Sequence, residues 1–153
     1  MTKVRDVMTK NVVAFKPEDS IYEAARILRE RKISGAPVVE GEKVVGMISE
    51  ADIMRLIEEH DIDVNTILPS PLDVLELPVR MKLELNEVLE KIKKASSALV
   101  SDVMTEKVVS ISPDAAISEA AKVMSGKKVN RLPVIEKGKL VGIVSRGDII
   151  GAL

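Results

Sequence analysis

Apolar and polar residues follow a set order along the first 59 residues, and this order predicts a β-α-β-β-α unit. Apolar residues recur three to four positions apart in two segments, which is typical of helices with one buried face. Runs rich in β-branched residues predict strands, and Gly41-Glu42 between two of them predicts a hairpin turn. The expected elements are a strand at 12–15, a helix at 21–31, strands at 36–39 and 44–48, and a helix at 50–59.

The chain contains this unit twice. Asp6-Val7-Met8-Thr9 recurs as Asp102-Val103-Met104-Thr105, and Val45-Gly46-Met47-Ile48-Ser49 recurs as Val141-Gly142-Ile143-Val144-Ser145. All the recurring pieces keep one spacing of about 96 residues without a gap, which indicates an internal duplication. A single copy is expected to leave an apolar face uncovered. We therefore predict an α+β fold in which two β-α-β-β-α repeats pack face to face around a pseudo-twofold axis.

The predicted boundaries are repeat 1 at 1–59, an insert at 60–97 and repeat 2 at 98–153. The insert begins with a proline-rich stretch that reads as a loop. Its second part, around 85–92, has the spacing of an amphipathic helix. The insert is either a connector that packs on the core or a docking surface for a partner, since its loop is unusually apolar.

Composition narrows the chemistry. The 153 residues include no Cys and one His, and the net charge is -1. These counts exclude disulfides, a cysteine nucleophile and sites built from several Cys or His ligands. The near-neutral charge gives little reason to expect binding to nucleic acid or a membrane surface. An acidic group near residue 60 is a solvated helix end or, as an alternative, a site for a divalent ion; it comprises Glu58, Glu59, His60, Asp61 and Asp63.

Targeting signals are also missing from the sequence. No apolar run approaches the roughly 18 residues that a membrane-spanning helix needs. The first six residues are charged and lack the apolar stretch of a signal peptide. We therefore expect a cytoplasmic location and no membrane partner.

The motifs shared by the two copies resemble those of the CBS domain. In repeat 1 they are Ile33-Ser34-Gly35-Ala36-Pro37-Val38-Val39, then Val44 to Ser49, then Asp52-Ile53. Repeat 2 has Val129-Asn130-Arg131-Leu132-Pro133-Val134-Ile135, then Leu140 to Ser145, then Asp148-Ile149. The whole chain resembles a tandem CBS pair, or Bateman module, of the stand-alone archaeal and bacterial type.

This resemblance implies a regulatory role. CBS pairs bind adenosine-containing ligands such as AMP, ADP, ATP or S-adenosylmethionine in clefts between the repeats. They commonly form homodimers and regulate another domain or protein. The resemblance therefore implies an adenosyl ligand, a homodimer and a regulated partner protein, with no catalytic cofactor and no metal.

The chemistry of Ser49 and Asp52 suits such a ligand. Ser49 lies where a strand ends and a helix begins, where backbone N–H groups and the helix dipole favour a phosphate. Asp52 lies one turn further, and a carboxylate can accept hydrogen bonds from both hydroxyls of a ribose. Each residue also has a purely structural explanation, as an N-cap and a helix-dipole partner. The same pair recurs as Ser145 and Asp148.

The resemblance assigns the remaining site residues to two clefts. The base-side wall opposite Ser145 and Asp148 is expected to comprise Thr9, Val13, Ile33, Ser34 and Gly35. The wall opposite Ser49 and Asp52 is expected to comprise Thr105, Val109, Val129, Asn130 and Arg131. Pro37 and Pro133 are expected to set the direction of the strands that meet the base. The apolar members can also be explained as core residues.

The two clefts are not equivalent in charge. Arg146 follows Ser145, whereas Glu50 follows Ser49. Glu50 is expected to repel a phosphate unless Arg131 reaches across from the opposite repeat. We therefore predict that the Asp148 cleft prefers phosphorylated nucleotides, and that the Asp52 cleft is emptier or takes a less anionic ligand. Arg146 can alternatively be a solvated surface charge.

Three classes of function follow. The leading hypothesis is a sensor that binds an adenosyl ligand and signals to a partner protein. The alternative is a ligand-independent dimeric scaffold with degenerate pockets. An enzyme is not expected, because the sequence shows no nucleophile with a base, no suitably spaced carboxylate pair and no glycine-rich phosphate loop.

Overall fold

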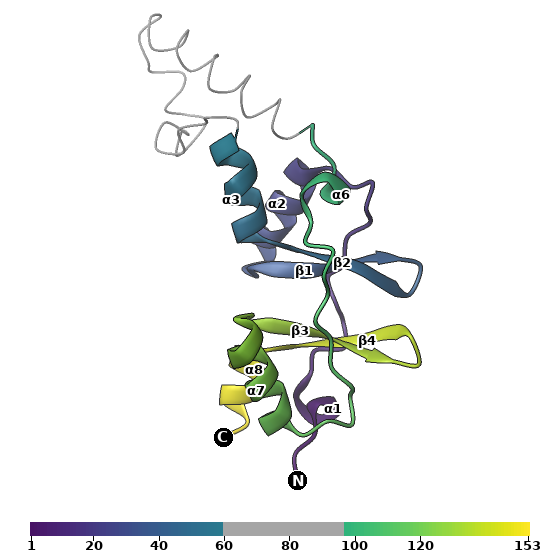
Figure 1. Cartoon of the computed structure of the whole chain (residues 1–153), viewed down its shortest axis with the longest axis vertical. Coiled ribbons are helices and arrows are strands. Elements are labelled where there is room, and N and C mark those ends of the chain that lie inside the picture. Colours follow the sequence, from purple (N-terminus) through teal and green to yellow (C-terminus); the bar gives the residue numbers. More distant parts are fainter. Residues whose placement is uncertain (60–96) are drawn as a thin grey trace, which may run out of the picture.

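A computed structural model describes residues 1–59 and 97–153, which fold into two similar halves (Figure 1). Each half is a two-stranded antiparallel hairpin with two longer helices on one side. The described elements are α1 (Val4–Val7), α2 (Ile21–Arg31), β1 (Gly35–Glu40), β2 (Lys43–Ser49), α3 (Glu50–Glu59), α6 (Val100–Val103), α7 (Ile117–Lys127), β3 (Arg131–Glu136), β4 (Lys139–Ser145) and α8 (Arg146–Gly151).

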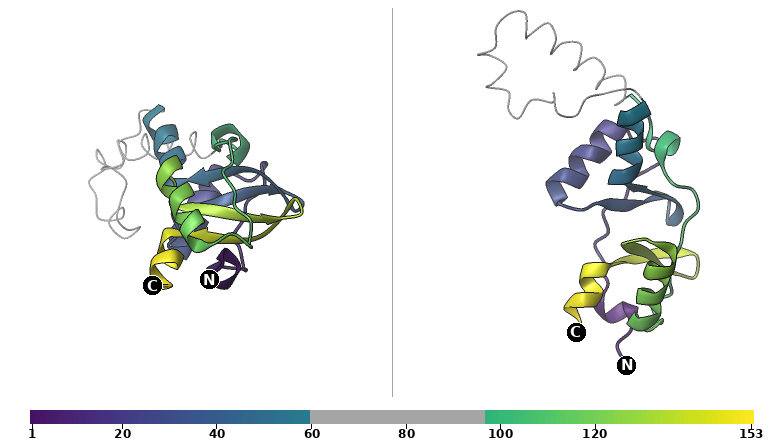
Figure 2. Two further views of the ribbon diagram at one scale, coloured as in Figure 1. Left: turned by 60° about the horizontal axis from the view of Figure 1, so that its bottom comes forward. Right: turned by 60° about the vertical axis from the view of Figure 1, so that its left-hand side comes forward.

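The two hairpins lie next to each other in the middle of the molecule, and the long helices lie on the outer sides (Figures 1 and 2). The hairpins share the same pairing: Gly35 lies opposite Ser49 in the first, and Arg131 lies opposite Ser145 in the second. Each hairpin also has a register irregularity at the matching place, after Val38 and after Val134. This agreement confirms that the duplicated sequence folds into a duplicated structure.

Each half has its own apolar core, between the hairpin and the helices. The first core includes Phe15, Ile21, Ala24, Leu28, Ala36, Val38, Ile48, Leu56 and Val100. The second includes Val4, Ile111, Ala120, Met124, Leu132, Val134 and Val144. Val4 belongs to repeat 1 but is fully buried in the second core, and Val100 belongs to repeat 2 but is fully buried in the first core.

The segments that carry these two valines are exchanged between the halves. The Val4 N–H donates to the Ala115 carbonyl at 2.9 Å, and the Val100 N–H donates to the Asp19 carbonyl at 2.8 Å. Further along each segment, Thr9 pairs with Ile143 and Thr105 pairs with Met47. Each core therefore contains a side chain from the other repeat, which links the two repeats of the duplication.

Two glycines let the exchanged segments approach the hairpins. A side chain at Gly46 would place its Cβ 2.6 Å from Met104 Sδ, and one at Gly142 would lie equally close to Met8 Sδ. Both distances are far shorter than ordinary van der Waals contact. Each Cβ would also lie close to a backbone carbonyl oxygen, that of Thr105 at 3.1 Å from position 46 and that of Thr9 at 3.0 Å from position 142, so the exchanged segments disfavour a larger residue at either glycine.

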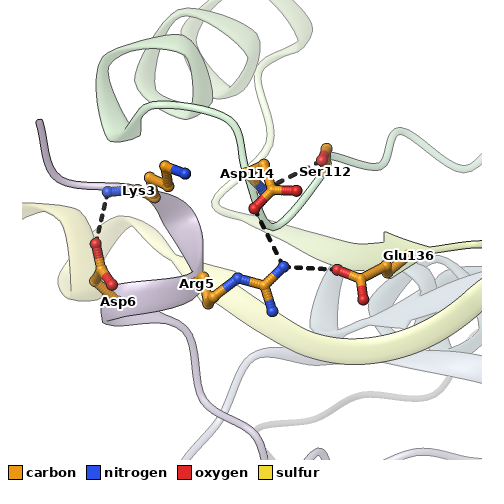
Figure 3. Close-up of polar contacts among 6 residues, drawn as sticks. All are labelled: Lys3, Arg5, Asp6, Ser112, Asp114 and Glu136. Atoms are coloured by element: carbon orange, nitrogen blue, oxygen red, sulfur yellow. Dashed lines mark hydrogen bonds and ion pairs between the residues drawn. The ribbon is translucent and has the colours of Figure 1, made fainter.

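An ion-pair cluster fixes the N-terminal segment to the second half (Figure 3). The Arg5 guanidinium donates to Glu136 at 2.7 Å and to Asp114 at 3.2 Å. These hydrogen bonds, first that of Glu136 and then that of Asp114, raise the pKa of Arg5. The matching position in the other exchanged segment is Ser101, which has no charge. The exchange is therefore symmetric in its buried valines and asymmetric at its surface.

The predicted strand at 12–15 is wrong in extent, because only Phe15 pairs there, in a single parallel bridge with Val38. The Phe15 N–H donates to the Pro37 carbonyl at 3.0 Å, and the Val39 N–H donates to the Phe15 carbonyl at 2.8 Å. Pro37 and Pro17 have no N–H group, so the ladder cannot extend around this bridge. The described part of the chain includes no helix long and apolar enough to cross a membrane.

Candidate ligand clefts between the repeats

One cleft between the repeats is formed around Asp52, and we call it the Asp52 cleft. Its volume is about 370 Å³, within the roughly 300–1,000 Å³ usual for small-molecule sites. Both repeats contribute to its walls. The lining residues are Ser34, Gly35, Met47, Ile48, Ser49, Glu50, Ala51, Asp52, Thr105, Lys107, Val109, Lys128, Val129, Asn130 and Arg131.

Asp52 is only 2% exposed, and its carboxylate is fully engaged. One oxygen accepts from the Ser49 N–H at 3.0 Å and from the Ser49 hydroxyl at 3.1 Å. The other accepts from Thr105 Oγ1 at 3.1 Å and from the guanidinium of Arg55. These four bonds use the whole acceptor capacity of a carboxylate. A ligand hydroxyl that binds Asp52 must therefore replace one of the present donors.

Basic side chains outnumber acidic ones on the walls of the Asp52 cleft. Lys107, Lys128 and Arg131 come from repeat 2, and they face Glu50 and Asp52 of repeat 1. Because Asp52 already pairs with Arg55, the net charge that a ligand meets here is positive. The backbone N–H groups at the start of α3 add to this positive potential. The cleft is therefore suited to an anionic group such as a phosphate.

The second cleft, which we call the Asp148 cleft, is much smaller, at about 150 Å³. Its walls also combine the two repeats, with the exchanged N-terminal segment at one side. The lining residues are Thr9, Asn11, Val13, Ile33, Gly35, Arg131, Ile143, Ser145 and Asp148.

Asp148 is less buried and less engaged than Asp52. One of its oxygens accepts from the Ser145 N–H at 2.8 Å, and its own N–H donates to Ser145 Oγ at 3.2 Å. Among the described residues, its second oxygen accepts no hydrogen bond at the usual distances. The position that matches Arg55 is Gly151, which has no side chain to offer. Asp148 is therefore free to accept from a ligand.

Arg131 lies between the clefts and lines both. Its guanidinium reaches across to repeat 1, where it donates to the Gly35 carbonyl at 2.7 Å and to the Ser34 hydroxyl. Burial lowers the pKa of Arg131, and the negative charge of Glu50 opposes this effect. Arg131 thus reaches the position from which it can offset Glu50.

The expected grouping of residues is found with three differences. Ser34, expected beside Asp148, lines the Asp52 cleft instead. Pro37 and Pro133 are fully buried within their strands, where their carbonyls accept from Phe15 and Ile111. Both prolines pack in the cores, and their role in setting the direction of the strands beside a base stays a prediction. The other expected members of each wall line the cleft to which they were assigned.

Arg146 is the third difference. It lines a separate hollow between α7 and α8 together with Met124, Ile149 and Ile150. Among residues 1–59 and 97–153, the walls of the Asp148 cleft carry only Arg131 as a basic side chain. Arg146 is the first residue of α8, and its N–H donates to the Asn130 carbonyl. Among the described residues, more basic side chains therefore line the Asp52 cleft than the Asp148 cleft.

Sequence reasoning missed Lys107 and Lys128. Lys107 lies two residues after Thr105 in the exchanged segment, and its counterpart in the other cleft is Asn11. A comparison of charges at matching positions in the two repeats would have identified this difference. The cluster around residue 60 lies mostly outside the described residues, as does the insert. The described residues contain no group of three or more acidic or His side chains arranged for a metal ion.

A family model for the CBS domain matches residues 4–59 and 100–153. MJ1426, an uncharacterized protein of Methanocaldococcus jannaschii, is 47% identical over 152 residues, which cover 98% of this chain and 90% of the relative. The chloroplastic CBS domain-containing protein CBSX1 of Arabidopsis thaliana is 32% identical over 155 residues, covering 97% of this chain and 63% of CBSX1.

Solved structures are similar over the whole chain. A crystal structure of CBSX2 in complex with AMP has a TM-score of 0.71 and 27% sequence identity, and the match covers 99% of this chain and 96% of CBSX2. The CBS domain of a membrane protein from Sphaerobacter thermophilus has a TM-score of 0.73 and 28% identity, covering 100% of this chain and 88% of that one.

Proposed function

The chain belongs to the CBS-domain family as a tandem pair, and on that premise we propose that it is a regulatory module that senses an adenosine nucleotide. The ligand binds in the Asp52 cleft, and a partner protein reads the resulting change in the module. The observation that carries the proposal is the combination of volume and positive charge in that cleft.

Each part of a nucleotide has a suitable partner in the Asp52 cleft. Asp52 accepts from the ribose hydroxyls, and Val109 and Val129 supply apolar surface for the base. Lys107 and Lys128 bind the phosphate. The same cations disfavour S-adenosylmethionine, whose sulfonium is positively charged. AMP or another adenosine nucleotide is therefore the preferred ligand class.

The similarity to CBSX2 supports this choice. CBSX2 has been crystallised with AMP, and its fold matches nearly the whole of this chain. No catalytic role is part of the proposal. The ligand acts by its different affinity for two arrangements of the module, since only such a difference can shift their balance.

Thr105 offers a route from ligand to signal. It donates to Asp52, and it lies at the end of the exchanged segment that begins with α6. A ribose hydroxyl that takes over this acceptor releases Thr105. Ligand binding then loosens one of the contacts by which the exchanged segment is held to repeat 1.

Calorimetric titration of nucleotide-stripped protein tests the function. The expected result is saturable binding of AMP, weaker binding of adenosine and the weakest binding of S-adenosylmethionine; ATP is titrated in the same series. Absence of binding for all of these ligands, with the fold intact by circular dichroism, would leave the ligand-independent scaffold as the function.

A matched pair of variants locates the phosphate. Lys107→Glu replaces a cation of the Asp52 cleft, and Asn11→Glu makes the same change at the matching place of the Asp148 cleft. Lys107→Glu is expected to weaken AMP roughly tenfold and adenosine much less, because a nearby charge is reversed. Asn11→Glu should leave AMP binding almost unchanged. The reverse pattern would assign the phosphate to the Asp148 cleft.

We also propose that a second copy of the chain covers two grooves between the helices. The first, between α2 and α3, is lined by Leu28, Ile53, Met54 and Glu50, and also by the basic residues Arg29, Lys32 and Arg131. The second is the hollow between α7 and α8 that contains Arg146. The two grooves occupy matching places in the repeats, but their charges at positions 50 and 146 are opposite. An antiparallel homodimer pairs Glu50 of one copy with Arg146 of the other.

Sedimentation analysis of charge-reversed variants tests this arrangement. Glu50→Arg and Arg146→Glu should each weaken the dimer, because each places like charges together. The double variant should restore it. A double variant that remains as weak as the single ones would contradict the antiparallel pairing, as would a wild-type protein that stays monomeric.

A further inference from the structure

Positions 35 and 131 match in the two repeats, yet one is glycine and the other is arginine. Both begin the first strand of their hairpin, Gly35 in β1 and Arg131 in β3. Gly35 has no room for a side chain, since a Cβ there would lie 2.9 Å from the Ile48 carbonyl oxygen. Arg131 therefore has a long side chain at a position where repeat 1 has none.

The Arg131 side chain lines both clefts, and it lies against the part of the wall that Gly35 contributes to the Asp148 cleft. It binds the Gly35 carbonyl and the Ser34 hydroxyl, and Gly35 and Ile33 line that cleft. The guanidinium is half-buried there, with a pKa lowered by that burial. One of its two acceptors, the Gly35 carbonyl, belongs to the wall of the Asp148 cleft against which a base would lie, so the side chain covers part of that wall. The other acceptor, Ser34, lines the Asp52 cleft.

The Asp148 cleft itself is small, and it shares Ile33, Arg131 and Ser145 with the adjoining groove between α2 and α3. Its volume of about 150 Å³ is below the roughly 300 Å³ at which ligand sites usually begin. In other respects it matches the larger cleft, with Thr9 and Val13 on one wall and Asp148 on the other. Asp148 also has an oxygen ready to accept, whereas Asp52 is fully engaged.

We propose that Arg131 is a plug that closes the Asp148 cleft, so that one side chain sets how many nucleosides the protein binds. This inference builds on the proposed function, because it takes the Asp52 cleft as the open site. Arg131 then has two effects: it adds positive charge to the open cleft, and it excludes the base from the closed one. Gly35 leaves the Asp52 cleft without a matching plug.

The number of adenosine molecules bound per chain tests the plug. Adenosine is the suitable probe because it has no phosphate, so its binding depends little on the charge of Arg131. Equilibrium dialysis with labelled adenosine is expected to give one site in the wild type and two in Arg131→Ala. Adding Asp148→Asn to Arg131→Ala should remove the second site.

A matched control separates the volume of Arg131 from its charge. Arg131→Met keeps a long side chain without the guanidinium, and it should still bind one adenosine. Arg131→Gly copies the residue of repeat 1 and provides a second opened variant if Arg131→Ala does not fold. Thermal melts confirm folding of each variant before dialysis.

The possible outcomes separate the two proposals. One site in both the wild type and the opened variants would overturn the plug and leave the proposed function intact. Two sites in the wild type would overturn the plug as well. No site in the wild type and one in Arg131→Ala would support the plug and refute the Asp52 cleft as the open site. No site in any variant would overturn both.

Discussion

The two clefts are built from the same duplicated sequence, yet they differ in volume, charge and the state of their carboxylates. The Asp52 cleft is more than twice as large as the Asp148 cleft, at about 370 against 150 Å³. The differences can be traced to a few matching pairs of residues. Lys107 in repeat 2 is at the position that matches Asn11 in repeat 1, and Arg131 is at the position that matches Gly35. A few substitutions after duplication are enough to give two similar clefts different chemistry.

The carboxylates show the same divergence. Asp52 is held by Arg55 and Thr105, whereas Asp148 has glycine in place of the arginine. An engaged carboxylate couples ligand binding to the release of a protein contact. A free one binds without such a change. The Asp52 cleft is therefore the better candidate for signalling.

The scaffold around the clefts remained symmetric. Val4 and Val100 are both completely buried in the opposite half, and both exchanged segments end in a threonine that lines a cleft. Packing constrains these positions in both repeats alike. Other core positions kept their apolar character but changed in size, as Ala36 and Leu132 show.

The largest expected difference between the clefts concerns their carboxylates. Asp52→Asn should weaken AMP roughly 10- to 100-fold, because hydrogen bonds from the ribose to a charged acceptor are lost. Asp148→Asn is the matched control and should change AMP binding little. Titration calorimetry measures both affinities, and thermal melts show whether Asp52→Asn also loosens the fold. Equal losses in the two variants would contradict the assignment of AMP to the Asp52 cleft.

The symmetric part of the molecule predicts equal effects. Val4→Ala and Val100→Ala each remove two methyl groups from a completely buried site, which should cost about 2 kcal/mol of unfolding free energy. The two losses should agree, since the exchanged segments are equivalent. Urea denaturation measures them. A small loss for Val4→Ala beside a large one for Val100→Ala would mean that only one segment is needed for the fold.

The smallest effect is expected at the surface cluster of the N-terminal segment. Arg5→Ala removes the ion pairs to Asp114 and Glu136, which are exposed to solvent and screened by salt. The melting temperature should fall slightly at low salt and almost not at all at high salt. Ser101→Ala, at the matching position, should show no dependence on salt. If Arg5→Ala lowered the melting temperature as much as Val4→Ala does, this surface cluster would be a main anchor of the segment.

The duplicated motifs were enough to predict the longer helices and the hairpins, but not the short helices α1 and α6. The periodicity of 21–31 and 50–59 matches α2 and α3, because one-sided burial leaves a local pattern in the sequence. The exchange of Val4 and Val100 has no such local pattern. The internal repeat shows that Val4 and Val100 are at matching positions. It does not show which of the two cores each valine is buried in.

The position of charges was harder to predict than the position of cleft walls. Arg146 follows Ser145 in the sequence, but as the first residue of α8 it lines the hollow beside α7. Lys107 is distant from Ser49 in the sequence and lines the same cleft. Long basic side chains reach several residues beyond their own position, so neighbours in sequence are a poor guide to the charge of a cleft.

A crystal structure of the protein with AMP tests the central claim most directly. The account predicts a nucleotide in the Asp52 cleft, with its ribose at Asp52, its phosphate near Lys107 and Lys128, and Arg131 still covering the Asp148 cleft. A nucleotide in the Asp148 cleft, with Arg131 displaced and the Asp52 cleft without nucleotide, would contradict it.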